Sequence, residues 1–151
     1  MKFFAKIIKS VRSLYLSRHS ELPHYFFSNK RVIIIGPADT AMSYLNSESI
    51  DNFDIIIRMN KALSNFDLFK GSLGSRTDLL FHCLDEHSKF GGGAINDEDL
   101  KKQKIKYLIY PHAALNIESN YLHIKKKVLS ASFVRINPLT CKKLKKELGV
   151  K

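Results

Sequence analysis

Two polar side chains, Arg58 and Asn60, stand two residues apart directly after the apolar run Ile55–Ile57. In an extended strand, residues at this spacing face the same side. Asn60 offers a hydrogen-bond donor and an acceptor at the strand end, which suits a ribose or a phosphate. Arg58 allows two interpretations: it contacts an anionic ligand, or it forms a structural ion pair, because a buried arginine needs a partner.

A second candidate site follows the run Val32–Ile35, where Gly36 begins a tight turn. A glycine here lets a ligand approach the backbone without a Cβ in the way, although a turn glycine that joins a strand to a helix is the simpler alternative. The corner as a whole consists of Gly36, Pro37, Ala38, Asp39 and Thr40. It matches neither the Gly-x-Gly-x-x-Gly fingerprint nor a Walker loop. A phosphorylated small molecule is the expected ligand.

A third polar segment, Gly74-Ser75-Arg76-Thr77-Asp78, precedes another apolar run. Arg76 has the fork geometry to hold a phosphate by two hydrogen bonds. It is equally able to tie this segment to Asp51 or Asp54, and the structural role is the favoured interpretation.

The histidines offer little chemistry by spacing. His82, His87, His112 and His123 do not share metal-ligand spacing with acidic or sulfur partners, so no metal site is expected. His82, followed by Asp85 and Glu86, ends a strand-like run and is a candidate for acid–base work, with a hydrogen-bonded core histidine as the alternative. No nucleophile motif is present, and catalytic residues are left unassigned.

These side chains are positioned by alternating strand and helix patterns. The pattern predicts strands at 32–35, 54–59, 78–82, 106–110 and 132–136, and helices at 39–45, 97–104 and 138–148. Such alternation predicts an α/β domain with a partial doubly wound, largely parallel, Rossmann-like sheet over residues 31–151. Ligands of open parallel sheets bind at the carboxyl ends of the strands, where the polar corners above lie.

Composition narrows the class of protein. With 151 residues, of which 44% are hydrophobic, the chain has room for one ordinary domain. Its net charge of +11 attracts anions, but the excess lies mainly at the two ends. The lysine runs at 125–127 and 142–146 lack interleaved aromatics and are interpreted as solvated helix faces, so no nucleic-acid partner is expected. The two cysteines, Cys83 and Cys141, indicate neither a disulfide framework nor a zinc site, and favour a reducing cytoplasm.

Residues 1–18 have the spacing of a basic amphipathic helix, and residues 19–30 read as a linker. The helix either packs on its own domain or lies on an anionic membrane surface. No signal peptide or transmembrane segment is expected. The predicted location is therefore cytoplasmic, with peripheral attachment at the inner face of the membrane as an option.

The order and spacing of these motifs resemble the large sialylmotif of the sialyltransferases of glycosyltransferase family 29, bacterial members above all. The residues that carry the resemblance are Ile35-Gly36, Ile50-Asp51, Phe53-Asp54, Arg58-Met59-Asn60-Lys61-Ala62, Phe66 and Gly74-Ser75-Arg76-Thr77, with a looser likeness from His82 to Gly92. It implies a GT-A-like variant of the α/β fold and metal-free transfer of sialic acid from CMP-sialic acid to a glycan acceptor. Asn60 and the corner at Gly36 would contact the donor nucleotide.

The chain departs from that family at two points. Pro37 replaces an asparagine of many animal members and lacks both its amide and a backbone N–H, so Asp39 or Thr40 are candidates to compensate. The small motif and the later histidine base are not found, so the chain is expected to be a truncated, donor-binding part without turnover of its own. The alternatives are a non-catalytic nucleotide-binding module and a basic peripheral membrane or nucleic-acid adaptor.

Overall fold

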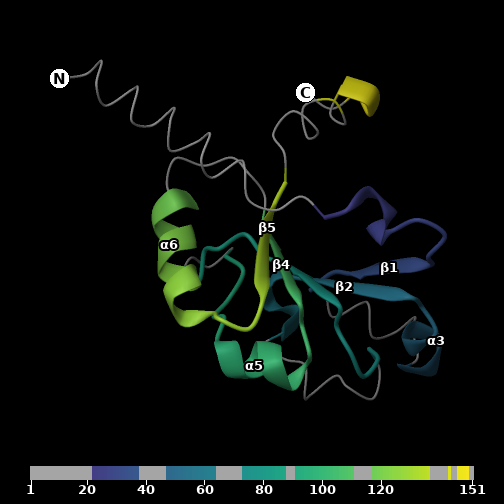
Figure 1. Cartoon of the computed structure of the whole chain (residues 1–151), viewed down its shortest axis with the longest axis horizontal. Coiled ribbons are helices and arrows are strands. Elements are labelled where there is room, and N and C mark those ends of the chain that lie inside the picture. Colours follow the sequence, from purple (N-terminus) through teal and green to yellow (C-terminus); the bar gives the residue numbers. More distant parts are fainter. Residues whose placement is uncertain are drawn as a thin grey trace.

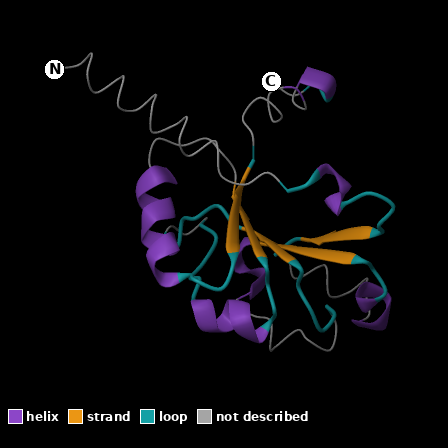
Figure 2. Cartoon of the chain, in the orientation of Figure 1, coloured by secondary structure: helices purple, strands orange, loops and turns teal. Residues whose placement is uncertain are grey.

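A computed structural model describes residues 22–37, 47–63, 73–87, 91–110, 117–136, 143 and 146–149. Its centre is a single sheet of five strands, all parallel (Figures 1 and 2). The strands are β1 (Val32–Ile35), β2 (Ile55–Met59), β3 (Leu79–Phe81), β4 (Tyr107–Tyr110) and β5 (Ser132–Arg135). Each lies within a predicted run. The prediction of an α/β domain with a parallel sheet is confirmed.

The strand order differs from the doubly wound arrangement that was predicted. Neighbours in the sheet are also consecutive in the chain, in the order β1-β2-β3-β4-β5. A doubly wound sheet requires a point at which this order reverses, and the five described strands contain no such point. Within the described sheet, a binding site must therefore be argued from the strand ends themselves and not from a switch in topology.

In the described ranges, three α-helices lie between consecutive strands: α3 (Ser47–Asp51), α5 (Asp97–Lys102) and α6 (Ile117–Lys127). Successive right-handed crossovers in one direction place their helices on one face of a sheet, and Figure 1 shows α3, α5 and α6 on the same side. The helix predicted at 97–104 is α5. It begins where the Asn96 side chain accepts a hydrogen bond from Asp99 N, and it ends early because Lys104 has a φ of 57°.

Helices α3 and α6 were not predicted with bounds. The buried positions of α6 and the residue after it are Tyr121, Ile124 and Val128, a narrow stripe with spacings of three and four. The predicted lysine run 125–127 does lie in this helix. It is not simply solvated, because Lys127 binds the carboxylate of Glu86 at 2.5 Å.

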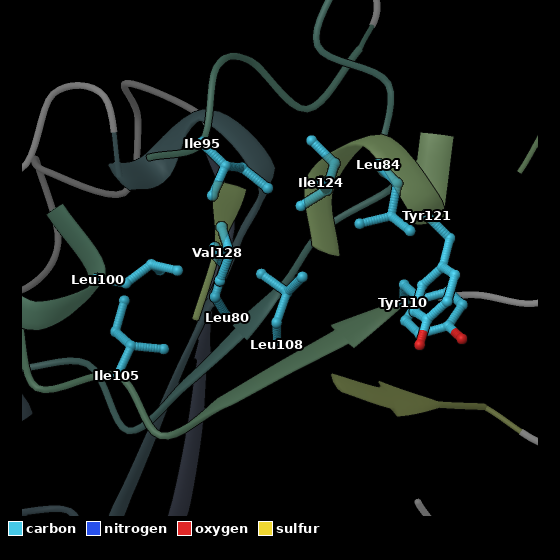
Figure 3. Packing of buried hydrophobic residues seen from close by; sticks show 10 residues of the cluster. All are labelled: Leu80, Leu84, Ile95, Leu100, Ile105, Leu108, Tyr110, Tyr121, Ile124 and Val128. Atoms are coloured by element: carbon cyan, nitrogen blue, oxygen red, sulfur yellow. The ribbon is translucent and has the colours of Figure 1, made fainter. Parts of the chain in front are cut away.

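The main core lies between the sheet and helices α5 and α6 (Figure 3). Its members are Leu80, Leu84, Ile95, Leu100, Ile105, Leu108, Tyr110, Tyr121, Ile124 and Val128. Side chains that alternate along each strand point to opposite faces, so the intervening residues Leu79, Ile109 and Val134 form a second cluster on the other face. Burial of each large aliphatic side chain contributes roughly 1.5 to 3 kcal/mol, and both faces of the central strands receive it.

The second face is covered in part by the segment that was predicted to be a linker. Residues His24–Phe26 form a short 3-10 helix, η1, on the side of the sheet opposite to the helices. The Phe26 ring meets Tyr107 edge-on at a centroid distance of 5.3 Å. This part of the range 19–30 is therefore packed onto the domain.

Several predictions fall outside the described residues. They are the amphipathic helix at 1–18, the helix at 39–45, and the corner residues Ala38, Asp39 and Thr40. Of the helix predicted at 138–148, residues 143 and 146–148 are described; residues 143, 146 and 147 are helical, and residue 148 lies in a turn. None of the helices in the described ranges has the length and apolar character needed to cross a bilayer.

Two glycines provide a matched test of this packing. A Cβ on Gly92 would lie 2.2 Å from Nε2 of the buried His82, whereas a Cβ on Gly36 would meet nothing within 4 Å. We expect Gly92→Ala to lower the free energy of unfolding by about 1 to 3 kcal/mol through overpacking, and Gly36→Ala to change it by less than about 0.5 kcal/mol, as at an unconstrained surface site. Urea unfolding of both variants is the measurement, and equal losses would contradict the described contact.

Candidate functional site

Polar groups gather where the five strands end. Because all strands are parallel, their carboxyl ends share one edge of the sheet. This carboxyl edge carries, from β1 to β5, Gly36 and Pro37, then Asn60, then His82 and Cys83, then Tyr110 and Arg135. The sequence analysis placed candidates at the ends of the first three strands. Tyr110 and Arg135 were missed, although the end positions of the last two predicted strands pointed to them.

Asn60 leaves β2 in a left-handed conformation, with a φ of 50°. Asparagine tolerates this region better than most residues, because its short polar side chain bonds locally. Its Oδ1 accepts a hydrogen bond of 3.0 Å from the backbone N–H of Cys83, just after β3. Within the described part of the chain, Nδ2 has no acceptor. The carboxamide is thus oriented by the protein at one atom and able to donate to a ligand at the other.

The neighbouring corner at Gly36 is open. Gly36 is half-buried, Pro37 is exposed, and a Cβ added at Gly36 would touch nothing within 4 Å. The φ of Gly36 is not in the positive range that favours glycine. Neither packing nor backbone conformation therefore requires a glycine here, which leaves close approach of another group to the backbone as a reason for it. The other residues of this predicted site, Ala38, Asp39 and Thr40, lie outside the described residues.

Arg58 has structural partners. Its side chain is 1% exposed, and Nε donates to Thr77 Oγ1 at 2.9 Å. Nη2 donates to the carbonyl of Leu73 and, more weakly, to that of Arg76 at 3.5 Å. Burial lowers the pKa of Arg58 to about 10, while the charge of Asp51 opposes this shift. Of the two interpretations of Arg58, the geometry favours the structural one, because the Thr77 hydroxyl and backbone carbonyls accept its hydrogen bonds.

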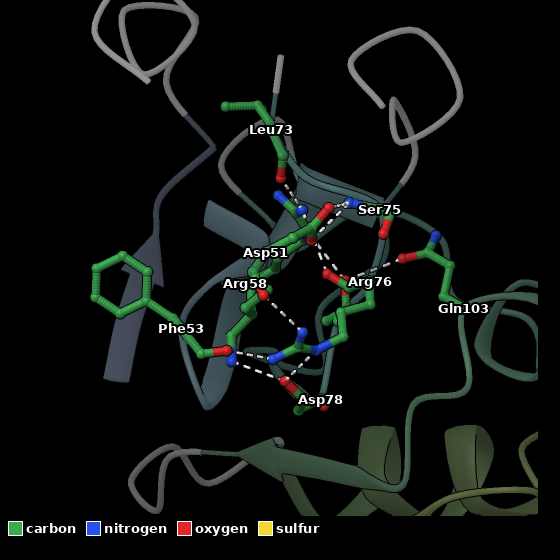
Figure 4. A network of polar contacts seen from close by, with 10 residues as sticks. Asp51, Phe53, Arg58, Leu73, Ser75, Arg76, Asp78 and Gln103 are labelled. Atoms are coloured by element: carbon green, nitrogen blue, oxygen red, sulfur yellow. Dashed lines mark hydrogen bonds and ion pairs between the residues drawn. The ribbon is translucent and has the colours of Figure 1, made fainter. Parts of the chain in front are cut away.

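Arg76 also acts within the protein (Figure 4). Its Nη1 donates to the carbonyl of Asp51 at 3.0 Å, Nη2 donates to the carbonyl of Phe53, and Nε lies 3.3 Å from Oδ2 of Asp78. Asp51 in turn accepts the Ser75 N–H through both carboxylate oxygens at 2.9 Å. The segment from Gly74 to Asp78 therefore joins the end of α3 to the start of β3, as the favoured structural interpretation predicted.

His82 is buried and hydrogen-bonded at both ring nitrogens. The backbone N–H of Leu84 donates to Nδ1 at 2.9 Å, and Nε2 lies 3.1 Å from the carbonyl of Gly93. An Nδ1 that accepts a hydrogen bond carries no proton, so the ring is neutral with its hydrogen on Nε2. Burial lowers the pKa of His82, against the opposing effect of the Gly92 and Gly93 carbonyls. This is the core alternative for His82 and not a group poised for acid–base work.

Behind the carboxyl edge, Glu86 links the segment after β3 to α6. Its side chain is 6% exposed and contacts Lys127 Nζ at 2.5 Å, His123 Nε2 at 3.5 Å and the Ile95 N–H at 2.7 Å. Burial alone would raise the pKa of Glu86, but these donors and the charges of Lys127 and His123 together hold it below its ordinary value. Sequence spacing gave no signal for this contact, because Glu86 and Lys127 are far apart in the chain.

The described residues thus define an α/β protein with polar groups at the carboxyl edge of its parallel sheet. No group of three or more His, Cys, Asp or Glu side chains in the described ranges is placed to hold a metal ion. Comparisons of the chain with protein-family models, with characterised proteins and with solved structures found no match.

The roles of the two arginines can be separated by stability. We expect Arg58→Ala to lower the free energy of unfolding by about 3 kcal/mol or more, because it removes the donor to the buried Leu73 carbonyl and one of the hydrogen bonds of Thr77. Arg76→Ala should cost about 1 to 2 kcal/mol, since its contacts are partly exposed. The exposed Arg31 serves as control, and Arg31→Ala should cost less than either. Denaturant unfolding that ranks Arg76 above Arg58 would contradict these roles.

The neutral His82 predicts acid sensitivity. Its folded pKa is lowered, so the unfolded chain binds the proton first, and stability that is fully present at pH 7 is lost as the pH falls below about 6.5. The loss attributable to this group is at most about 1.4 kcal/mol per pH unit. Unfolding measured from pH 7.5 to 5 should show a shallower decline in His82→Asn than in wild type. The same substitution at an exposed histidine, His87→Asn, is the matched control for the change of residue type.

Proposed function

We propose that this chain is the donor-binding part of a sialyltransferase-like glycosyltransferase, and that it holds the cytidine nucleotide of CMP-sialic acid at the carboxyl ends of β1 and β2. The observation that carries the proposal is the state of Asn60. Its carboxamide is anchored through Oδ1, has an uncommitted donor in the described part of the chain, and follows β2 beside the open Gly36 corner on β1.

The chemistry of the corner suits a ribose or phosphate. An oriented amide N–H donor pairs with a hydroxyl or a phosphate oxygen, and a glycine without packing constraints permits close approach to the backbone. Neither group requires a metal ion to act. The basic character of the whole chain adds a general attraction for a nucleotide anion.

The other motif residues support the site indirectly. Arg58 and Arg76 hold the segment 73–78 against α3 and β2, and this contact fixes β2 beside β3. The end of β2 is where Asn60 leaves the sheet. In this proposal Asn60 and Gly36 contact the donor, and the arginines are positioning residues that act through the backbone.

The proposal concerns binding, and it leaves the catalytic base and the glycan acceptor unassigned. His82 is neutral and occupied at both nitrogens, which argues against it as the base. A non-catalytic nucleotide-binding module would use the same corner. The proposed inner-membrane attachment through residues 1–18 remains a prediction from sequence.

Calorimetry with CMP, UMP and AMP, each with and without EDTA, tests the proposal. We expect CMP to bind in the presence of EDTA and more tightly than AMP, because the contacts proposed for the corner need no metal. Binding of CMP only when a divalent metal is supplied, or no binding of any nucleotide, would refute it.

Variants of Asn60 sharpen this experiment. Asn60→Asp keeps an acceptor for the Cys83 N–H but removes the donor, so the fold should remain while CMP affinity falls by about 1 to 3 kcal/mol. Asn60→Gly removes the side chain without strain at a φ of 50° and should lose similar affinity. Uncharged cytidine is measured alongside CMP to separate loss of the donor from repulsion by the new carboxylate. Unchanged affinity in both variants would show that Asn60 serves only to join β2 and β3.

A further inference from the structure

A second polar group of the carboxyl edge, Arg135, ends the strand β5. Within the described part of the chain, its Nε and Nη1 atoms are buried and have no hydrogen-bond partner. The other arginines of the described residues, Arg31, Arg58 and Arg76, each donate to a backbone carbonyl. Arg135 is unlike them, because the described residues leave two of its guanidinium nitrogens without a partner.

A guanidinium is charged at every physiological pH and has donors but no acceptor. Burial of such a group without a partner is strongly unfavourable. Native proteins rarely leave a buried polar group unpaired, and an exception calls for an explanation such as an ion or a ligand. An oxyanion satisfies the fork of an arginine through two parallel hydrogen bonds, and both carboxylate and phosphate have the required geometry.

The surroundings of Arg135 suit an anion at this end of the strand. Arg135 is paired in register with Tyr110, and it lies on the same face of β5 as Phe133, which packs on the helix-side core. The Tyr110 ring stacks on Tyr121 at a centroid distance of 5.3 Å on the same face of the sheet. The pKa of Tyr110 is raised to about 12, chiefly by burial, so its phenol keeps its proton and does not neutralise Arg135.

The course of α6 adds to the positive potential there. The helix leads from its last residue, Lys127, back to the start of β5, and Figure 1 shows it running opposite to that strand. Its N-terminal end therefore lies at the carboxyl edge, where the helix dipole is positive. The helix end supplies only a general attraction, whereas the unpaired Nε and Nη1 donors of Arg135 are the specific feature.

We propose that Arg135 is a binding residue for an oxyanion, a carboxylate or a phosphate, of the small molecule that occupies the carboxyl edge. Three strand spacings separate β5 from β2, which at ~4.8 Å each places Arg135 about 14 Å from the end of β2. A ligand that reaches both must extend along the edge. If the ligand is the CMP-sialic acid of the proposed function, on which this step rests, Arg135 binds one of its anionic groups. These are the phosphate and the carboxylate of the sugar.

The test measures binding of ligands that differ in their anionic groups. They are cytidine, CMP, free N-acetylneuraminic acid, its methyl ester, inorganic phosphate and CMP-sialic acid, titrated at constant ionic strength into wild type, Arg135→Gln and Arg135→Lys. Arg31→Gln is the matched control, because it makes the same change of charge at an exposed position at the start of β1. We expect Arg135→Gln to lower the affinity for CMP-sialic acid at least tenfold and the affinity for cytidine less than twofold. Arg135→Lys should have an intermediate effect on these affinities, and Arg31→Gln should have none.

The pattern across ligands identifies the source of the oxyanion. If Arg135→Gln weakens binding of the free sugar acid but not of CMP, and leaves binding of the methyl ester unchanged, Arg135 binds the carboxylate. If the substitution weakens binding of CMP and of inorganic phosphate, Arg135 binds the phosphate. Thermal unfolding without ligand adds a second readout: Arg135→Gln removes an unpaired buried charge, so its midpoint should equal or exceed that of wild type, whereas a structural arginine would lower it.

The outcomes for the two proposals are distinguishable. If CMP binding depends on Asn60 while all affinities remain within twofold in Arg135→Gln and its unfolding midpoint falls, the inference about Arg135 is overturned and the proposed function stands. If cytidine compounds do not bind but phosphate or the sugar acid binds through Arg135, the inference stands and the proposed function fails. Should Arg135→Gln fail to fold, the affinities of Arg135→Lys decide the inference by the same criteria.

Discussion

The buried guanidinium of Arg58 is the interaction on which the centre of this protein depends. It projects from β2 and donates to the side chain of Thr77 and the carbonyl of Leu73, in the segment that leads to β3. Thr77 then contacts Gln103, just before β4. The Arg58 side chain thereby links β2 to the segments that precede β3 and β4. A buried cation is unfavourable unless it is well hydrogen-bonded, so this network constrains the segment to one arrangement.

Around that network the molecule separates structural from binding roles by position. The arginines and carboxylates that hold the sheet together, including Arg76 and Asp51, act on backbone groups before β2 and β3. Asn60 and Arg135 lie at the opposite, carboxyl edge, and each retains donor atoms that the described residues do not use. Most polar residues of the motifs therefore stabilise the fold through backbone groups, and a small number of polar groups at the carboxyl edge remain for a ligand.

Prediction from sequence succeeded where the pattern is local. The runs at Val32–Ile35 and Ile55–Met59 are apolar and rich in β-branched residues, which marks a buried parallel strand whatever surrounds it. It succeeded less well for α6, whose apolar stripe of Tyr121, Ile124 and Val128 is narrow and interrupted by charge. The doubly wound arrangement was expected from alternation of strands and helices alone. Alternation does not specify strand order, which depends on where each crossover returns to the sheet.

The sequence by itself determined the strands, the α/β class, and the placement of Gly36 and Asn60 at strand ends, because each follows from neighbours in the chain. Only the tertiary structure decided the roles of the charged and titratable groups. Arg58 is structural because it meets a carbonyl and a hydroxyl of the segment before β3, and His82 because it meets the Leu84 N–H and the Gly93 carbonyl. Arg135 is a candidate for binding because no described group meets its Nε and Nη1. The partners of a buried polar group come from anywhere in the chain, so spacing in the sequence carries no record of them.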